Sequence, residues 1–563
     1  MQSKYRWRVA PKISDDLKLQ LLYNRKIITK SRPSKSKIEA FLTPNTKKHL
    51  FDPFKLSDLK KAVGRILKAA KNKEKVGVFS DYDADGIPGA ALVYQGLKKL
   101  KLKPLVYIPS RSEGYGFSQG AVDFFTKEKV TLVVAVDVGI RDFKTLKFAK
   151  RKKIDVIVCD HHEPAKNLPQ AYALINPKKK KEKYPFKELS GAAVAFKLLQ
   201  GLSKKDSRIN NHFLRWSLDL VAISVIFDMV PLISENRIFA KLGLLILKNT
   251  KRLGLRELFK VSSLSREQID AYVVGFILGP RINAPGRIYN PQTSFELLIT
   301  KSPKKARDLA QILDAVNKER QKETEKCLLE AKKLIQKKKL HKNKVILIES
   351  DEWPEGLIGL IASKLKEEFN RPVFVFARGE KTAKGSARSI DGFHLIEALG
   401  KVKKLIVKGG GHAKAAGLEL ESENIERFYE KLLQWANKKI KPKDLTPILD
   451  IDAEIDFKKI SWQFWNLVDS LAPFGMGNPR PLFLTKKVKV KEVRTIGREE
   501  RHLSLFLEKD DQLLRAVYFN GGEHLAKIRR EGYIDLVYSI SVNDFSGQPK
   551  LELKIEDLRL VKN

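Results

Sequence analysis

The stretch VFSDYDADGIPG (78–89) places three aspartates, Asp81, Asp83 and Asp85, at alternate positions directly after an apolar run. Ionised carboxylates this close repel one another, and one that lies near a protein interior needs a compensating cation. The stretch is therefore either a solvated acidic turn or part of a site that binds something strongly positive. The apolar run before it predicts a buried strand, and the residues from about Pro88 onward predict a helix.

Three more apolar runs follow, each separated from the next by a segment of helix length: LKPLVYIP (102–109), VTLVVAVDVG (130–139) and IDVIVCDHH (154–162). Short buried strands that alternate with helices predict a parallel sheet with crossover helices. Acidic or histidine residues stand at the carboxyl ends of three of these strands. Because open parallel sheets bind ligands beyond the carboxyl ends of their strands, we expect a site there.

The candidate site residues at the strand ends are carboxylates and imidazoles. They are Asp81, Asp83, Asp85, Asp137, Asp160, His161 and His162, joined by Asp228 from the apolar segment 220–233. Each alone has an ordinary explanation, since an Asp after a strand often caps a helix or makes a turn. Together they form a hard ligand set, which suits Mg²⁺ or Mn²⁺. Several carboxylates imply more than one cation, so we predict two divalent metal ions about 3.5–4 Å apart that hold a phosphoryl group.

Composition limits the other classes of site and partner. The chain has only two cysteines, Cys159 and Cys327, which disfavours a disulfide framework and a zinc cluster and favours a reducing cytoplasm. No run approaches the roughly 20 apolar residues of a membrane span, and the N-terminus shows no secretory signal. The net charge of +43 makes nucleic acid the leading partner, with a generally basic surface as the alternative.

The sequence predicts five parts. We expect a basic N-terminal segment (1–70) that packs on the core, the parallel-sheet domain (71–300), a long charged helix (301–340), a second, smaller α/β domain (341–442) and a C-terminal domain (443–563). In the last part, short strands with turn signals follow one another closely, which predicts a small OB-type β-barrel.

The motifs DYDADG (81–86), VDVG (136–139), CDHH (159–162) and FDMVPL (227–232), in this order, resemble the four motifs of the DHH phosphoesterase superfamily. Four further motifs resemble the RecJ family of single-strand-specific 5′→3′ DNA exonucleases: GPRINAPGR (279–287), KGSARSIDGFHLIEAL (384–399), GGGHAKAAG (409–417) and LAPFGMGNPRPLF (471–483). The resemblance covers nearly the whole chain. It implies a DHH domain, a DHH-associated substrate-binding domain and an OB-type domain that binds nucleic acid.

The resemblance also implies how the metal ions are held. One ion would be surrounded by Asp83, Asp137, His161 and Asp228. The other would be held by Asp85 and by Asp137, which bridges the two, with Asp81 as an additional or supporting ligand. Many superfamily members have a His four residues before the second Asp of the first motif, where this chain has Phe79, so the second ion would be held more weakly.

Two residues of the CDHH motif are predicted to have roles other than metal binding. Asp160 would orient a neighbouring ligand or cap the end of the strand, and His162 would bind the scissile phosphate and stabilise developing charge. A structural hydrogen bond is the alternative role for His162.

Other residues are candidates for binding phosphate or DNA. Gly409, Gly410 and Gly411 would let backbone N–H groups approach an anion, beside Arg388, Ser389 and His412. Arg281 and Arg287 carry guanidinium groups that match phosphate oxygens. In the loop 109–118, Arg111 would bind phosphate and Tyr115 would stack on a base, with a surface arginine and a core tyrosine as the alternatives.

The predicted function is a single-stranded-DNA-specific 5′→3′ exonuclease that hydrolyses phosphodiester bonds with two metal ions, in DNA repair and recombination. The direction of cleavage follows from the resemblance alone, and so do single-strand-binding protein and a helicase as partners. We expect a monomer in the cytoplasm, associated with the nucleoid. The alternatives are a small-substrate phosphodiesterase for short oligonucleotides or cyclic dinucleotides, a protein that binds single strands without cutting them and, least favoured, a scaffold.

Overall fold

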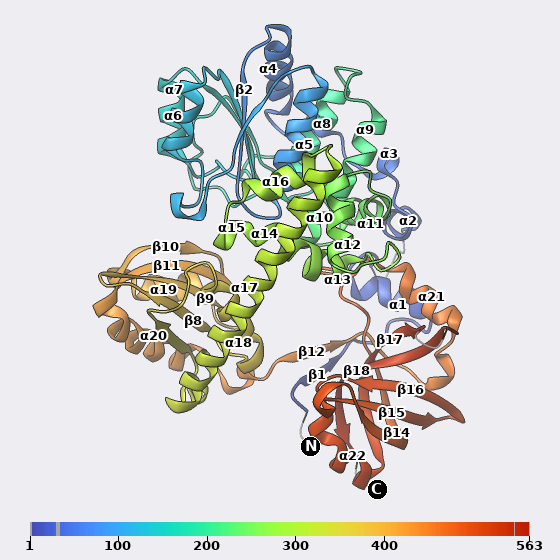
Figure 1. Cartoon of the computed structure of the whole chain (residues 1–563). Coiled ribbons are helices and arrows are strands. Elements are labelled where there is room, and N and C mark those ends of the chain that lie inside the picture. Colours follow the sequence, from blue (N-terminus) through green and yellow to red (C-terminus); the bar gives the residue numbers. More distant parts are fainter. Residues whose placement is uncertain (1–2, 30–33, 545–546, 562–563) are drawn as a thin grey trace. The chain divides into compact units, whose positions relative to one another are not determined.

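A computed structural model describes residues 3–29, 34–544 and 547–561 (Figure 1). Its contacts divide the chain into two compact units. The parallel-sheet unit comprises Arg25–Lys318 and Ser470–Arg480. The barrel unit comprises Met1–Asn24, Glu319–Asp469 and Pro481–Asn563. Each unit is therefore assembled from pieces that are not contiguous in the sequence.

The parallel-sheet unit is built on five strands in the order β3-β2-β4-β5-β6, and all neighbours run parallel. The strands are β2 (Val76–Ser80), β3 (Leu105–Tyr107), β4 (Leu132–Val136), β5 (Asp155–Cys159) and β6 (Ala173–Ile175). The chain builds outward from β2 first to β3 and then, on the other side, to β4. This places a topological switch point between β2 and β4, where ligands bind in open α/β sheets.

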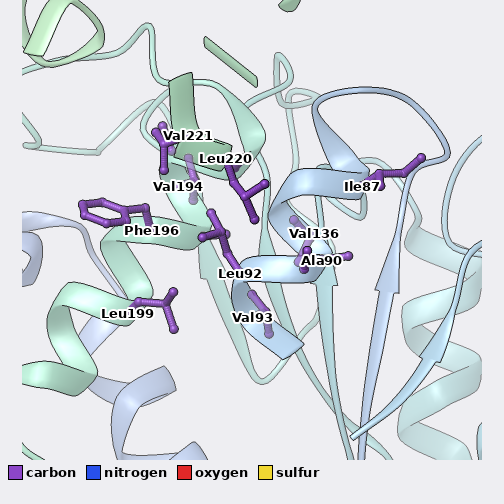
Figure 2. Close-up of a cluster of buried hydrophobic side chains, with 14 of the residues drawn as sticks. Ile87, Ala90, Leu92, Val93, Val136, Val194, Phe196, Leu199, Leu220 and Val221 are labelled. Carbon is purple, nitrogen blue, oxygen red and sulfur yellow. The ribbon is translucent and has the colours of Figure 1, made fainter. Parts of the chain in front are cut away.

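Side chains along these strands alternate between the two faces of the sheet, so each face has its own core. Helices α4 (Leu59–Lys71), α5 (Gly86–Lys99) and α8 (Gly191–Ser203) cover one face, and α6 (Gln119–Lys127) and α7 (Phe143–Arg151) cover the other. Helix α10 (Leu218–Phe227) packs on α5 and α8. Figure 2 shows Leu92, Phe196 and Leu220 from these three helices within the first core.

Further helices complete this unit: α2 (Lys35–Leu42), α3 (Thr46–His49), α9 (Asn211–Trp216), α11 (Ser234–Lys248), α12 (Leu253–Val261), α13 (Ala271–Val273), the π-helix η3 (Val274–Leu278), α14 (Gly279–Asn283), α15 (Pro285–Ile288) and α16 (Gln292–Ile299). The long helix α17 (Pro303–Lys337) begins in this unit and ends in the other, as the sequence predicts. None of the helices in the described part of the chain combines the length and apolar character that crossing a membrane requires.

The barrel unit holds a second sheet, with strand order β10-β11-β9-β8-β7. Its strands are β7 (Ile346–Ser350), β8 (Val373–Arg378), β9 (Thr382–Arg388), β10 (Ile406–Gly411) and β11 (Ala415–Glu421), and its helices are α18 (Ile358–Phe369), α19 (Leu395–Lys401) and α20 (Ile425–Lys439). Cys327, Ala331 and Ile335 from the second half of α17 are buried in a core with α18 and β8. This is the second α/β domain that the sequence predicts.

The C-terminal domain is a closed five-stranded barrel. Its strands are β14 (Phe483–Ile496), β15 (His502–Lys509), β16 (Gln512–Tyr518), β17 (Tyr533–Asn543) and β18 (Lys550–Leu560). They pair in the order β14-β15-β16-β18-β17, and β14 also pairs with β17, which closes the barrel. Helix α22 (Leu525–Glu531) lies between the third and fourth strands in sequence. A five-stranded Greek-key barrel is the architecture of an OB-fold, so the predicted fold class is confirmed.

The N-terminal segment is divided between the two units. Strand β1 (Arg6–Val9) pairs in parallel with β12 (Ile448–Ile451), and helix α1 (Leu17–Asn24) follows it in the barrel unit. Trp7 packs against the core that includes Ile451, and its indole N–H donates to Asp557 Oδ2 at 2.7 Å. The expectation that residues 1–70 pack on the core stays a prediction, and the contacts of the chain divide this segment at Asn24, with strand β1 and helix α1 in the barrel unit.

Candidate metal centre

The carboxyl ends of β2, β4 and β5 are adjacent in the sheet, and the side chains that follow them meet there. Asp81 follows β2, Asp137 follows β4, and Asp160 and His161 follow β5. Asp228 arrives from elsewhere, as the residue that ends helix α10. Strand pairing brings the first four together, and helix packing adds the fifth.

The imidazole of His161 lies at the centre of this group. Its Nε2 atom is 3.2 Å from Asp137 Oδ1, 3.5 Å from Asp85 Oδ2 and 3.6 Å from Asp228 Oδ2. Ligand atoms within 4.8 Å of one another form three sets: Asp137, His161 and His162; Asp85, His161 and Asp228; and Asp81, Asp83 and Asp137. Sets of carboxylate and imidazole ligands this compact suit Mg²⁺ or Mn²⁺.

Two observations indicate that a cation fits these residues. Asp137 Oδ1 and His161 Nδ1 are buried, and neither has a hydrogen-bond partner in the described part of the chain. Asp137 also has a left-handed backbone, with φ of 62°, which is uncommon for any residue other than glycine and concentrates at functional sites. A buried carboxylate oxygen without a partner is costly unless it binds a cation.

The electrostatics of the group point the same way. Burial and then the neighbouring carboxylates raise the pKa of Asp81, Asp83, Asp137 and Asp228, and for all but Asp83 the rise is large. Burial lowers the pKa of His161 to about 4, so its imidazole is neutral and free to act as a ligand at pH 7. Bound cations would compensate the crowded negative charge.

The carboxylate of Asp85 is held by residues that the sequence alone did not single out. It accepts hydrogen bonds from the backbone N–H groups of Gly191 (2.7 Å) and Ala192 (2.8 Å) and from the hydroxyl of Ser224 (2.6 Å). A Cβ on Gly191 would lie 2.5 Å from Asp137 Oδ1, so only glycine fits between the two aspartates. The sequence feature that could have indicated these supports is the segment LSGAAVA (189–195), in which Ser190 caps helix α8 and Gly191 is its first residue.

Asp83 makes helix-start hydrogen bonds and also lies among the candidate metal ligands. Its Oδ1 accepts hydrogen bonds from the N–H groups of Asp85 (2.8 Å) and Gly86 (3.0 Å) at the start of α5. It also lies in the ligand set with Asp81 and Asp137. The ordinary helix-capping role therefore coexists with a position at the candidate metal site.

The groups of candidate ligands in the structure differ from the assignment of ligands to ions that the resemblance implies. Asp85 lies with His161 and Asp228, whereas Asp83 lies with Asp81 and Asp137. The assignment of individual residues to one ion or the other stays a prediction. Phe79, at the position where other superfamily members have a His, is fully buried in the core on the α6–α7 face, 4.9 Å from Phe117 between ring centroids.

Asp160 and His162 form a tight pair at the edge of the group. Asp160 Oδ1 accepts hydrogen bonds from the backbone N–H groups of His161 (2.7 Å) and His162 (3.0 Å) and lies 2.8 Å from His162 Nδ1. Burial alone would shift both pKa values the other way, but their hydrogen bond and mutual charge lower the pKa of Asp160 to about 2 and raise that of His162 to about 9. His162 is therefore a cation at pH 7.

The loop before α6 faces this pair. The hydroxyl of Tyr115 lies 3.2 Å from His162 Nε2, and 61% of Tyr115 is exposed. Asp142, which we did not single out, holds the loop, because its Oδ2 accepts a hydrogen bond from Phe117 N–H at 2.7 Å. Tyr115 thus combines the exposure needed for stacking with a contact to the candidate catalytic histidine.

Arg111 and the PGR end of the GPRINAPGR motif lie beside the first motif. The Arg111 guanidinium lies 5.2 Å from the centroid of the Tyr82 ring, and its Nε donates to Gly286 O at 3.4 Å. A Cβ on Gly286 would lie 2.6 Å from Tyr82 O, so glycine is required for this approach. The charge of the neighbouring Arg287 acts on Tyr82 as well. Two predicted phosphate-binding arginines are thus adjacent to the metal-site turn.

Arg281 is placed differently. Its Nε and Nη2 atoms each lie 2.9 Å from Asp314 Oδ1 on α17, and Nη1 donates to Ile277 O at 2.9 Å. Both side chains of the ion pair are largely buried. These partners favour a structural role for Arg281 over the predicted phosphate contact.

The remaining candidates lie in the barrel unit. Gly409, Gly410 and Gly411 belong to β10, an edge strand that pairs with β11, and the turn after them is closed by His412, which donates its N–H to Ala415 O at 2.7 Å. Arg388 on β9 is opposite Ala415 of β11. The Ser389 hydroxyl donates a hydrogen bond to Phe393 O at 2.7 Å. This local contact uses the hydroxyl's proton within the turn that follows β9. The sheet therefore brings the motifs KGSARS (384–389) and GGGHAKAAG (409–417) onto neighbouring strands. The roles of their residues in binding phosphate or DNA stay predictions.

Family models match three parts of the chain: the DHH family, N-terminal domain, at residues 75–225; the DHHA1 domain at residues 342–438; and the RecJ OB domain at residues 451–557. The single-stranded-DNA-specific exonuclease RecJ of Bacillus subtilis (strain 168) is 36% identical over 510 residues, which are 90% of this chain and 64% of that relative. This chain therefore spans just under two thirds of that relative's length. The RecJ of Haemophilus influenzae is 33% identical over 532 residues, 91% of this chain and 92% of that relative.

Solved structures agree with these relatives. The crystal structure of RecJ from Thermus thermophilus in complex with Mn²⁺ has a TM-score of 0.84 and 27% identity, and covers 99% of this chain and 80% of that one. The crystal structure of the same protein in complex with Mg²⁺ has a TM-score of 0.77 and 26% identity, and it covers 99% of this chain and 79% of that one.

Proposed function

The chain belongs to the RecJ family of single-stranded-DNA-specific exonucleases, and on that basis we propose that it hydrolyses single-stranded DNA from the 5′ end with two divalent cations, Mn²⁺ or Mg²⁺, in DNA repair and recombination. The observation that carries the proposal is the convergence of Asp85, Asp137 and Asp228 on Nε2 of His161, within 3.6 Å. These carboxylate and imidazole side chains are suited to divalent metal ions.

The ligand sets suggest which residues hold the ions. Asp81, Asp83 and Asp137 hold one, and Asp85, His161 and Asp228 hold the other. When bound, two divalent cations neutralise charge on a phosphodiester and activate the attacking water. Asp137 is the residue best placed to contact both ions, because it lies in the set with Asp81 and Asp83 while its Oδ1 is also 3.2 Å from Nε2 of His161 in the other set.

The protein's own groups bind and orient the substrate. Protonated His162 donates a hydrogen bond from Nε2 to a phosphate oxygen and stabilises the negative charge that develops there. Asp160 keeps His162 oriented and protonated through the 2.8 Å contact to Nδ1. Arg111, stacked on Tyr82, offers its guanidinium to the phosphate at the end of the strand, and exposed Tyr115 stacks on a base.

The barrel domain and the positive charge of the molecule bind the part of the DNA strand that lies beyond the metal centre. OB-folds bind single strands in grooves that follow the backbone, and the net charge of +43 raises the local concentration of DNA. We extend the proposal to a monomer that works at the nucleoid in the cytoplasm, with single-strand-binding protein and a helicase as partners. These last points rest on the family alone.

The test compares single-stranded DNA labelled at the 5′ end with the same strand labelled at the 3′ end, with Mn²⁺ present. We expect mononucleotides to appear at once from the 5′ label and late from the 3′ label, with duplex DNA resistant. Asp137→Asn should lower the rate at least about a hundredfold, because it removes a shared ligand while preserving the left-handed backbone that Asn tolerates.

The other outcomes separate the alternatives. Survival of long strands together with cleavage of dinucleotides or cyclic dinucleotides would favour a small-substrate phosphodiesterase. Tight binding of single strands without cleavage by any divalent ion would favour a non-catalytic binding protein. Early release from the 3′ label would contradict the proposed direction.

A further inference from the structure

The segment Ser470–Arg480, here called the strap, belongs to the parallel-sheet unit, although the chain before and after it belongs to the barrel unit. Before it comes helix α21 (Trp462–Ser470), and after it comes β14, the first strand of the barrel. The strap contains most of the motif LAPFGMGNPRPLF, which the proposed reaction does not use. Its place within the unit that holds the metal centre calls for a physical explanation.

The strap has a fixed shape of its own. Asn478 is fully buried, and its Nδ2 donates hydrogen bonds to Leu471 O and Pro473 O, each at 2.8 Å. The backbone N–H of Gly475 donates to Asn478 O at 2.9 Å, and that of Asn478 donates to Gly475 O at 3.1 Å. One buried side chain and a closed turn therefore determine the path of the segment.

Basic side chains of the parallel-sheet unit hold the strap in place. Arg25 donates from Nε to Asn478 Oδ1 at 2.9 Å and from Nη2 to Pro479 O at 2.8 Å. Arg237 and Lys241, on α11, donate to Ala472 O at 3.1 Å and to Ser470 O at 3.0 Å. Because a charged donor that loses its acceptor in a buried position is costly, these contacts fix the strap firmly.

The strap lies directly on the loop that follows Asp228. The backbone N–H of Leu232 donates to Met476 O at 2.7 Å. A Cβ on Gly475 would lie 2.8 Å from Leu232 Cδ1, and a Cβ on Gly477 would lie 3.1 Å from Pro231 Cβ. The two glycines of the FGMGNP sequence thus allow a close approach to the metal-site loop, and Gly477 also has a left-handed backbone, with φ of 72°.

The loop has few other supports between Asp228 and the strap. The N–H of Asp228 ends α10 by donating to Ser224 O at 2.9 Å, and Met229 then adopts a left-handed φ of 56°. Asn236 Nδ2 donates to Pro231 O at 3.1 Å. The chain therefore turns sharply at the ligand and is held again at Pro231 and Leu232, where the strap packs.

We infer that the strap is a positioning element for the metal centre: it holds the loop 228–233 so that the Asp228 carboxylate meets His161 and Asp85. The inference rests on the proposed function, since it concerns the metal ligand Asp228. Groups that orient a metal ligand contribute to metal affinity without touching the ion. Displacement of the strap should therefore weaken binding of Mn²⁺ through Asp228 and leave the fold of the unit in place.

The experiment uses a matched pair of glycine variants in the full chain. Gly477→Ala adds a methyl group against Pro231, whereas Gly532→Ala adds one at a nearly identical φ of 73° with nothing within 4 Å. Both should lower the melting temperature of the metal-free chain by a similar amount, because both strain a left-handed backbone. We expect Gly477→Ala to raise the Kd for Mn²⁺, measured from the EPR signal of free Mn²⁺, about tenfold, and Gly532→Ala to leave it unchanged.

A double variant tests whether the strap affects Mn²⁺ binding through the Asp228 carboxylate. In an Asp228→Asn background, Gly477→Ala should have no further effect on Mn²⁺ affinity, because the strap acts through that carboxylate. Additive losses, or a Gly477→Ala chain that binds Mn²⁺ as the wild type does, would overturn the inference while the proposed function stands. A wild-type chain that binds no Mn²⁺ would overturn both.

Discussion

Small residues arrange the carboxylates of the candidate metal centre. Gly191 donates its N–H to Asp85 while its missing side chain leaves room for Asp137 Oδ1. Ser224 donates to Asp85 and lies 2.5 Å from the hydroxyl of Ser190. The carboxylates are therefore arranged by short residues of α8 and α10, whose chemistry alone would not attract notice.

Gly191→Ala should abolish nuclease activity without unfolding the chain. The added Cβ would lie 2.5 Å from Asp137 Oδ1 and 2.7 Å from Asp137 Cβ, so the carboxylate must move. Gly120→Ala on α6, where nothing lies within 4 Å of the new methyl group, is the matched control. Nuclease rate and circular dichroism measure the outcome, and an active Gly191→Ala chain would show that Asp137 tolerates displacement.

The pair of Asp160 and His162 predicts a pH dependence of stability for the metal-free chain. Asp160 raises the pKa of His162 from 6.5 to about 9 despite burial, so the folded state holds the proton more tightly than the unfolded state. This contribution to the free energy of unfolding is fully present below pH 6.5 and is lost as the pH rises through about 9. In EDTA, the difference in stability between wild type and His162→Gln should therefore shrink between pH 6.5 and 9.5, measured by urea unfolding. A constant difference would mean that the pKa of His162 is not raised.

The structure brings most of the predicted ligands close together, and their roles as metal ligands stay a prediction. Acidic residues after apolar runs are visible in the sequence, and pairing of neighbouring strands is enough to bring Asp81, Asp137 and Asp160 together. Two supports of Asp85 were missed because a backbone N–H carries no residue identity, and the third, the Ser224 hydroxyl, was missed because it lies 139 residues away in the sequence. Which candidate ligands lie together depends on the directions of the side chains in the turn 81–85. The spacing of the aspartates in the sequence does not determine those directions.

At the scale of secondary structure, α17 is attached to the parallel-sheet unit by a buried ion pair. The Arg281 and Asp314 side chains are 13% and 10% exposed, and Lys318 also lies 2.7 Å from Asp314. The sequence predicted a single long helix with a charged surface, and the helix is observed. What periodicity could not predict is which of its many charges is buried against α14.

Arg281→Ala should lower the free energy of unfolding by about 3 kcal/mol, because it leaves the buried Asp314 carboxylate without its main partner. Lys305→Ala is the control on the same helix, since its pair with Glu296 is half exposed and should be worth less than about 1 kcal/mol. Urea unfolding and the KM for single-stranded DNA are both measured. A raised KM with unchanged stability would instead restore the phosphate-binding role that the sequence predicted for Arg281.

Strand pairing shows the same limit of sequence interpretation. Four of the five parallel strands were predictable because helix-length segments separate their apolar runs, whereas β6 follows β5 with no helix between them and was missed. The pairing of β1 with β12 joins residues from opposite ends of the chain, with no local signal to link them. Long-range pairs of this kind are determined by packing, here of Trp7 beside Ile451.

For the molecule as a whole, the excess of basic residues predicts how DNA would be bound. With 109 Lys and Arg against 66 Asp and Glu, the chain should bind single strands largely through phosphates, with release of counterions. Composition predicted this partner, whereas it could not predict that both units are assembled from separated pieces of chain.

Binding of a long oligothymidylate in EDTA should therefore weaken steeply with salt. If six or more phosphates are contacted, the Kd should rise at least about three hundredfold between 50 and 200 mM NaCl. A dinucleotide, with fewer phosphates, should show a much shallower dependence, and fluorescence anisotropy measures both. Equal slopes for the two would place the contacts at the metal centre alone and leave the barrel without a part in binding.

The strap also has a consequence for how the molecule is made. Proteins emerge from the ribosome N-terminus first, and their domains fold as units during synthesis. Residues 25–318 leave the ribosome long before residues 470–480, so the loop of Asp228 waits for its support until the barrel is about to be translated. If the strap positions Asp228 as proposed, an unfinished copy lacks the final arrangement of its candidate ligands until almost the whole chain has been made.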